Sequence, residues 1–334
     1  MRPSAKVTRP KSHHYVPRFY LSRFADAKGR LWVLDKPTGK KFRTTVENLA
    51  CVNHFYELPE LAKAGLDANL LEKQFSGVEG QAAAVLASVG DVQRGKKIDA
   101  FEDRASRSSF ALFLVLQILR TPEARRVLLD FLRFLVAGNS SAPRLPQSEA
   151  EERSLHADVL WHDTHVRRLV RRVSEMIWFV GYNESDALFL TSDNPALEKS
   201  GDHRGWVVNS LVTSVIFEGV RDPSDNIVFP LSPRLVLYCY DRKGNPKMTR
   251  LGNTVTPVPF TSDMVNHENS GQVGMSSRFV YSTDGDFSFA EEFIRDQPWV
   301  QDPERARFAD RKNPYEASDT TNDAKASGPS KSKA

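Results

Sequence analysis

"FALFLVLQIL", residues 110–119, is the longest apolar run of the chain and predicts a buried helix. The run is too short to cross a bilayer, which takes about 20 apolar residues, and it carries Gln117. The helical pattern around it extends from about residue 101 to 136, with Asp99 as the expected N-cap. Pro122 is expected to break or kink this helix.

Helical patterns also lie on either side of this central helix. Residues 67–89 place apolar side chains at helical spacing, and a second pattern with many charges covers residues 149–173. A loop rich in Gly, Ser and Pro, residues 138–148, separates the charged helix from the central one. A last helical pattern covers residues 261–277.

Short β-prone runs lie at both ends of this helical region. Residues 31–34 and 41–45 flank a Pro-Thr-Gly turn and predict a hairpin. Further strands are predicted at MIWFVGY (176–182), ALFLT (187–191), NIVFPL (226–231), RLVLYCY (234–240) and RFVYS (278–282). We therefore expect an α+β fold, with a central helical segment and mostly antiparallel strands at the N-terminus and in the C-terminal half.

The composition is that of a globular protein, because 40% of the residues are hydrophobic and 26% are charged. The formal net charge of +4 permits a nucleic-acid partner without requiring one. Cys51 and Cys239 fit no metal-ligand or redox spacing, which favours a reducing compartment. No apolar stretch follows the basic N-terminus, so we expect a cytoplasmic protein with no membrane partner.

Three regions are predicted along the chain. Residues 1–11 combine basic side chains with prolines and small residues and are expected to form a flexible basic arm. Residues 12–300 are expected to form a single α+β domain. Residues 311–334 lack apolar anchors and are predicted to be a disordered tail.

Five stretches carry a family resemblance: HHYVPRFYLSRF (13–24), NHFYEL (53–58), FLVLQILRTPEAR (113–125), FLTSDNPA (189–196) and FPLSPRLVL (229–237). In this order, over roughly residues 12–285, they resemble the bacterial domain-of-unknown-function 4238 family. The resemblance implies no activity. It marks the positions that match the family's motifs, namely His13, His14, Pro17, Gln117, Arg120, Asp193, Asn194 and Pro195.

The adjacent histidines His13 and His14 are the first candidate site residues. Neighbouring side chains of an extended segment point to opposite faces, so we expect only one of the two in a site. That imidazole would serve as a general base or a metal ligand. The alternative is a structural histidine that hydrogen-bonds the backbone.

The sequence TSDNP places Asp193 and Asn194 at the end of a predicted strand, where polar groups often serve function. Within hydrogen-bond reach of His14, Asp193 would orient the imidazole or help to hold a divalent ion, and Asn194 would contact the ligand. The alternative is an Asx-type turn that needs no ligand.

Gln117 and Arg120 are three residues apart on one face of the central helix, within an apolar run. A buried arginine requires a partner. One interpretation is a bidentate contact between Arg120 and a phosphate or carboxylate ligand, with Gln117 beside it. The other is a structural salt bridge to an acid such as Glu72 or Glu79.

The charged helix carries two further candidates. His162 and His165 have a spacing compatible with metal binding, although no third ligand is evident. A basic run would contact nucleic-acid phosphates or form a solvated face. This run consists of Arg167, Arg168, Arg171 and Arg172.

Three functional hypotheses follow. The first is a hydrolase for a phosphate-containing substrate, of nuclease or phosphodiesterase type, with His13 or His14 as the base, Asp193 beside it and Arg120 on the phosphate. The second is a non-catalytic module that binds an anionic small ligand or nucleic acid. The third is a structural or interaction protein. The sequence specifies no cofactor, and a divalent metal ion enters only through the first hypothesis.

Overall fold

The computed structural model describes residues 12–58, 61, 63–90, 98–137, 144–200, 205–208, 210–214, 225–251 and 256–308. The predictions for residues 1–11 and 311–334 lie outside these residues.

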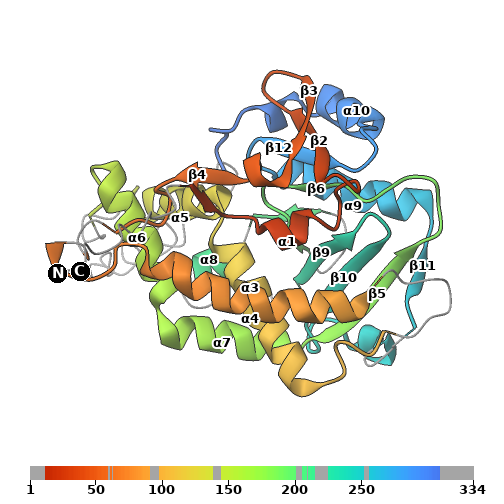
Figure 1. Cartoon of the computed structure of the whole chain (residues 1–334), viewed down its shortest axis with the longest axis horizontal. Coiled ribbons are helices and arrows are strands. Elements are labelled where there is room, and N and C mark those ends of the chain that lie inside the picture. The colour runs from red at the N-terminus through yellow and green to blue at the C-terminus, as the bar shows by residue number, and fades with distance from the viewer. Residues whose placement is uncertain are drawn as a thin grey trace, which may run out of the picture.

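The largest sheet has its strands in the order β11-β5-β10-β9-β7-β8 (Figure 1). These strands are β5 (Ile177–Asn183), β7 (Leu197–Lys199), β8 (Trp206–Val207), β9 (Asn226–Ser232), β10 (Leu235–Tyr240) and β11 (Val258–Phe260). Neighbouring strands are antiparallel except β11 and β5, which are parallel. The predicted antiparallel strands of the C-terminal half are thus confirmed for β5, β9 and β10.

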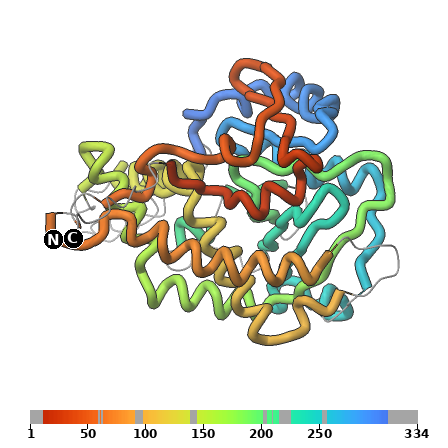
Figure 2. The backbone as a smooth tube through the Cα atoms, viewed as in Figure 1, coloured from red at the N-terminus to blue at the C-terminus, as the bar shows by residue number. Residues whose placement is uncertain are grey.

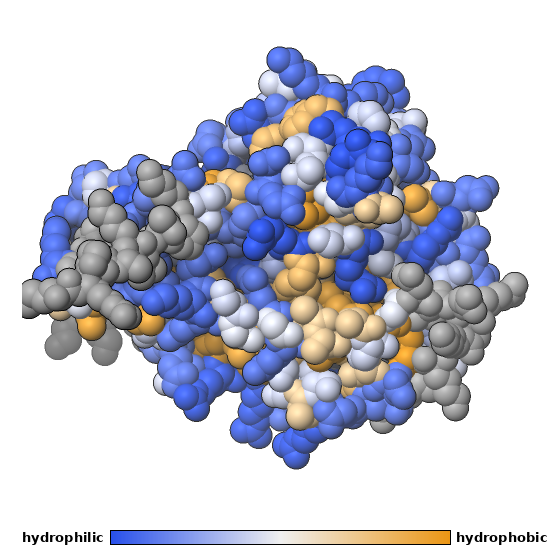
Figure 3. All heavy atoms as spheres, in the orientation of Figure 1, coloured by the Kyte–Doolittle hydropathy of each residue, from blue (hydrophilic) through white to orange (hydrophobic). Residues whose placement is uncertain are grey.

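The two faces of this sheet belong to different hydrophobic cores, because side chains alternate along each strand. On β10, Leu237 and Cys239 face the main core, whereas Tyr238 and Tyr240 face a second core. β9 and β10 are buried along their whole length, as strands covered on both faces should be. Figure 3 shows apolar side chains gathered on the viewed face in the region of these strands.

Helices pack into the main core. They are α3 (Leu70–Val89), α4 (Arg104–Leu119), α5 (Pro122–Val136), α6 (Glu149–Trp161), α7 (Asp163–Glu175) and α8 (Ser210–Ser214). The run that predicted a buried helix forms most of α4, where residues 113–119 are all buried. α3 and α7 pack on α4, and this central helical segment confirms the α+β fold class.

A four-stranded sheet in the order β3-β2-β12-β6 joins segments from distant parts of the chain (Figures 1 and 2). Its strands are β2 (Arg30–Asp35), β3 (Lys40–Thr45), β6 (Thr191–Ser192) and β12 (Phe279–Ser282). β2 and β3 are the predicted hairpin. β2 then pairs with β12, whose residues follow almost 250 positions later.

The remaining elements lie around these sheets. β1 (Ser12–His14) pairs with β4 (Cys51–Asn53) in a short antiparallel ladder. The other elements are α1 (Arg18–Leu21), η1 (Val46–Asn48), η2 (Pro246–Leu251), α9 (Ser262–Met275), α10 (Ser288–Asp296) and η3 (Pro298–Gln301). α9 and β12 match the last predicted helix and strand.

Several predicted boundaries were wrong. The helix expected over residues 149–173 is two helices, α6 and α7, which meet at the non-helical residue His162. Of the strand expected at 187–191, only Thr191 is in a strand, because residues 187–190 form no ladder. The cap of α4 is Asp103, whose carboxylate accepts a hydrogen bond from the Ser106 N–H at 2.7 Å, rather than Asp99.

No helix among the described ranges is long and apolar enough to cross a membrane. Cys51 and Cys239 are free thiols and form no disulfide.

Candidate functional site: a polar cavity beside His14

The two histidines of β1 point to opposite sides, as the alternation of an extended strand predicts. His13 is fully buried, and its Nδ1 accepts a hydrogen bond from the Tyr56 N–H at 3.0 Å. The His13 ring stacks on the Tyr56 ring with centroids 5.9 Å apart. His14 is only half-buried, and its Nε2 lies 3.2 Å from the carbonyl oxygen of Glu47.

His14 lines a cavity of about 370 Å³, which we call the His14 cavity. Its walls come from β1, α1, η1 and α3. The α3 wall presents Glu72, Ser76 and Glu79, which share one helix face because they are spaced at i, i+4 and i+7. α1 contributes Arg18. η1 adds the carboxyl group of Glu47, so the fold brings an imidazole, three carboxyl groups and a guanidinium into one cavity.

The carboxyl group of Glu72 has an oxygen atom without a hydrogen-bond partner among the described residues. Its Oε2 is buried and accepts no hydrogen bond from any residue that the structure describes. Burial, and then the nearby charge of Glu79, raise the pKa of Glu72 to about 7. Glu72 therefore exchanges its proton near neutral pH, where an ordinary glutamate is fully ionised.

The pKa of His14 is shifted in the opposite direction to that of Glu72. Burial lowers the pKa of the His14 imidazole below its ordinary value of 6.5, because the charged form loses hydration. The hydrogen bond with the Glu47 carbonyl opposes this shift only in part. At neutral pH the cavity therefore holds a neutral imidazole, which can accept a proton, beside a carboxyl group that can donate one.

Arg120 lies behind the cavity wall and holds Glu79. It is 1% exposed, and its Nη1 donates to Oε1 of Glu79 at 2.7 Å. Its Nε and Nη2 donate to Oε1 of Gln117 at 3.1 and 2.8 Å. Gln117 in turn donates from Nε2 to the Tyr15 carbonyl at 3.0 Å. The salt bridge to Glu79, one of the two acids considered from the sequence, is thus the arrangement that the structure shows.

Arg18 is the cation that remains available in this cavity. Its side chain is exposed and forms no ion pair with any residue in the described ranges. Because Arg120 is already bonded to Glu79 and Gln117, Arg18 is better placed than Arg120 to contact an anionic ligand.

Asp193 lies elsewhere and binds backbone. Its carboxylate accepts hydrogen bonds from the N–H groups of Ser277, Arg278 and Phe279 at 2.8, 2.7 and 2.8 Å. These groups link α9 to β12, so Asp193 fixes that connection. Burial raises the pKa of Asp193, and the three backbone donors oppose this shift. Asp193 does not line the His14 cavity and makes no hydrogen bond with His14.

Asn194 links the connection between α9 and β12 to the start of α5. Its Nδ2 donates to the Met275 carbonyl at 3.0 Å, and its Oδ1 accepts a hydrogen bond from the Thr121 hydroxyl at 3.2 Å. Thr121 is the N-cap of α5. Of the residues expected in a site, His14 lines the same cavity as Glu79, and Arg120 binds Glu79. Gln117 accepts hydrogen bonds from Arg120, and His13 lies on the opposite face of β1. It places Asp193 and Asn194 at the end of α9.

The exposed face of α7 carries the other candidates. The rings of His162 and His165 lie 4.1 Å apart. Among the described residues, Arg167 pairs with Asp163, Arg171 with Glu175 and Arg172 with Asp241, and Arg168 lies 3.4 Å from Nδ1 of His165. In the part of the chain that the structure describes, no three His, Cys, Asp or Glu side chains lie close enough to hold a metal ion together.

Sequence reasoning missed Glu72, Ser76 and Arg18 as site residues and named Glu72 only as a potential partner of Arg120. The i, i+4, i+7 stripe of polar residues on α3 was the available signal. Its meaning depends on α1, which contacts α3 and contributes Arg18 to the same cavity. That contact is tertiary and has no local signature.

A family model described as "protein of unknown function" (DUF4238) matches residues 12–286. The chain belongs to this family. The DUF4238 match includes every residue that lines the His14 cavity and also Gln117, Arg120, Asp193 and Asn194. No curated protein and no solved structure matches the chain.

Proposed function

We propose that this DUF4238 protein is a hydrolase that acts on a phosphodiester or a similar phosphate-containing substrate in the His14 cavity. The observation that carries the proposal is the buried Glu72 carboxyl group, with a pKa near 7 and an unsatisfied oxygen, in a cavity that it shares with His14 and Arg18. Titratable groups with pKa values displaced in opposite directions often mark the acid and the base of a site.

Each group has a role in the proposed reaction. Neutral His14 accepts a proton from a water molecule, whose oxygen forms the new bond to phosphorus. Protonated Glu72 donates its proton to the leaving oxygen as the phosphorus–oxygen bond breaks. Arg18 binds the non-bridging phosphate oxygens and stabilises the charge that develops there. Arg120 positions Glu79, whose charge helps to keep Glu72 protonated.

The test is hydrolysis of a dinucleoside monophosphate, whose alkoxide leaving group needs a proton, by the wild-type protein and by Glu72→Gln, His14→Gln and Arg18→Ala. Loss of the general acid or base should lower kcat by about 100- to 10,000-fold. Glu291→Gln is the matched control, because Glu291 is an exposed carboxylate that pairs with Lys41 outside the cavity. Wild-type turnover that survives both the Glu72 and the His14 substitutions would refute the assignment.

A second candidate function is anion binding without chemistry, and the available guanidinium of Arg18 favours it. In that case inorganic phosphate binds to the wild type in calorimetry and not to Arg18→Ala, while no phosphodiester is turned over between pH 5 and 9. A nucleic acid is one such anionic ligand. The α7 arginines support it less well, since Arg167, Arg171 and Arg172 are paired with acids.

A further inference from the structure

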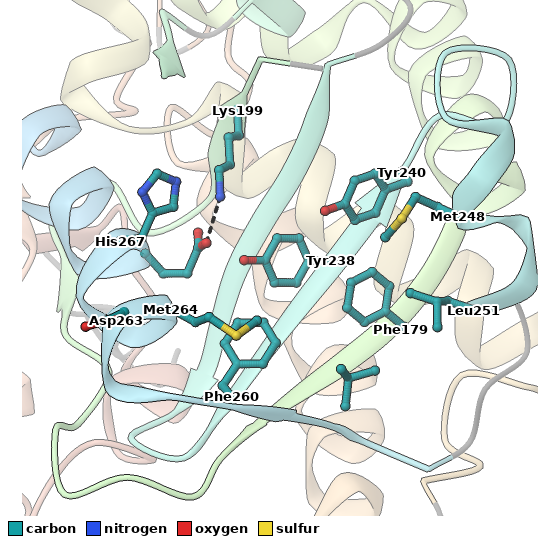
Figure 4. A pocket seen from close by; sticks show the side chains of 12 residues that line it. Phe179, Lys199, Tyr238, Tyr240, Met248, Leu251, Phe260, Asp263, Met264 and His267 are labelled. Carbon is teal, nitrogen blue, oxygen red and sulfur yellow. Dashed lines mark hydrogen bonds and ion pairs between the residues drawn. The ribbon is translucent and has the colours of Figure 1, made fainter. Parts of the chain in front are cut away.

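A second cavity, of about 500 Å³, lies between α9 and the second-core face of the large sheet (Figure 4). We call it the aromatic cavity. Its residues lie in the range 179–268, so it shares no residue with the His14 cavity. A cavity of this size is in the range that binds small organic molecules.

One wall of the aromatic cavity is a row of stacked aromatic rings. The rings of Phe179 and Tyr238 have centroids 5.0 Å apart and planes that differ by 3°. Tyr240 continues this row, 5.5 Å from Phe179 with an interplanar angle of 16°. The row exists because these residues project from the same face of β5 and β10, which are paired strands. A planar ligand can extend this stack or meet the ring edges, and both arrangements give favourable aromatic contacts.

Flexible apolar side chains form other parts of the lining. Met248 and Leu251 come from η2, and Met264 comes from α9 (Figure 4). Methionine adapts its shape to a bound ring and makes favourable sulfur–aromatic contacts. Met264 is 40% exposed, so it lies where the cavity meets solvent.

A buried ion pair forms the polar end of the cavity. Nζ of Lys199 lies 2.7 Å from Oε1 of Glu268, and the two side chains are only 6% and 4% exposed. Oε2 of Glu268 is buried and accepts no hydrogen bond of ordinary geometry from the described residues. Burial, and then interaction with Glu268, raise the pKa of the Tyr238 hydroxyl, and the second contribution places that group close to the carboxylate. A buried acceptor left in this state is unfavourable, so a ligand that donates a hydrogen bond to it gains affinity.

The charged and polar groups at this end of the cavity indicate which kind of ligand it would bind. Because Lys199 already neutralises Glu268, a second cation is not required, and a neutral N–H donor satisfies Oε2 at lower desolvation cost. The hydroxyls of Tyr238 and Tyr240 point toward the side on which Lys199 lies (Figure 4). A ligand ring on the aromatic wall therefore brings its edge to these polar groups.

We propose that the aromatic cavity binds a neutral, planar heteroaromatic molecule whose ring N–H donates a hydrogen bond to Oε2 of Glu268. This site is separate from the His14 cavity, and binding there does not require the proposed hydrolase activity.

The test compares indole with benzofuran, which has the same shape but lacks the N–H. Calorimetric or NMR titration of the full chain should give a Kd for indole at least tenfold lower than for benzofuran. In the double variant Lys199→Met/Glu268→Met, which leaves no unpaired buried charge, the two probes should bind within twofold of each other. Equal binding of both probes to the wild type would overturn the assignment of Glu268.

Two substitutions of exposed residues locate the site without disturbing a core. Met264→Trp should fill the mouth of the cavity and weaken indole binding at least tenfold. Leu66→Trp, at a 56% exposed residue outside the cavity, should leave the Kd unchanged. Indole binding that resists Met264→Trp, or no indole binding at millimolar concentration, would overturn the proposal.

Discussion

Nη1 of Arg120 lies 2.7 Å from Oε1 of Glu79, although Arg120 is 1% exposed and Glu79 still reaches the His14 cavity. A buried guanidinium thereby fixes the position of a carboxylate that lines the cavity. Removal of Arg120 should thus affect both the stability of α4 and the protonation of the cavity.

Arg120→Met should lower the free energy of unfolding by about 3–5 kcal/mol, because it leaves Gln117 and Glu79 without their partner. Arg120→Met/Glu79→Met should lose less than the single variant, since no unpaired charge then remains. Chemical denaturation measures both. Arg167→Met, at an exposed pair on α7, is the control and should change the unfolding midpoint little. Equal losses for Arg120→Met and Arg167→Met would contradict the burial argument.

Glu72 should make stability depend on pH. Its pKa is about 7 in the folded chain against an ordinary 4.5, so the folded state retains a proton that the unfolded state loses between these values. Stability contributed by this group therefore falls as pH rises from about 4.5 to 7. Glu72→Gln should match the wild type at pH 4 and melt at a higher temperature at pH 8.

Glu47, on the same cavity, supplies a control of opposite sign for the Glu72 experiment. Its pKa is lowered, mainly by hydrogen bonding with Thr45, so Glu47→Gln should not stabilise the chain at pH 8. A similar response of the two variants would mean that burial of Glu72 does not control its titration.

Lys36 provides an independent pH test. It is fully buried, its Nζ donates to the carbonyls of Val273 and Ser276 at 2.7 and 2.9 Å, and burial lowers its pKa to about 7. Between pH 7 and 10 the unfolded state binds the proton that the folded state has released, so stability from this group rises with pH. Lys36→Met should therefore be more destabilising at pH 9 than at pH 6. A pH-independent difference in unfolding free energy would show that Lys36 stays charged.

Asp193→Asn should destabilise the chain, because an amide NH₂ would face backbone N–H groups that now donate to a carboxylate. The expected loss is about 2 kcal/mol or more in the free energy of unfolding. Hydrogen exchange should show faster opening at residues 277–279. Unchanged stability with lost hydrolysis would instead support the catalytic role first expected from the sequence.

Local patterns predicted most of the helices and the opposite orientations of His13 and His14, since both depend on the periodicity of the backbone. They did not predict that Glu72 lines a cavity or that Asp193 binds backbone. The donors to Asp193 lie 84 to 86 residues further along the chain, and Glu72 faces a cavity only because α1 contacts α3. Such contacts depend on the tertiary structure, which single-sequence patterns do not specify.

The pairing of β2 with β12 constrains the order of folding during synthesis. All residues that line the His14 cavity emerge within the first 79, and Arg120 follows soon after, but β2 stays an open sheet edge until residues 279–282 have left the ribosome. Closure of a contact this distant in sequence is slow. The nascent chain therefore exposes one unpaired edge of β2 for most of its translation, and truncations before β12 should be captured by chaperones or aggregate.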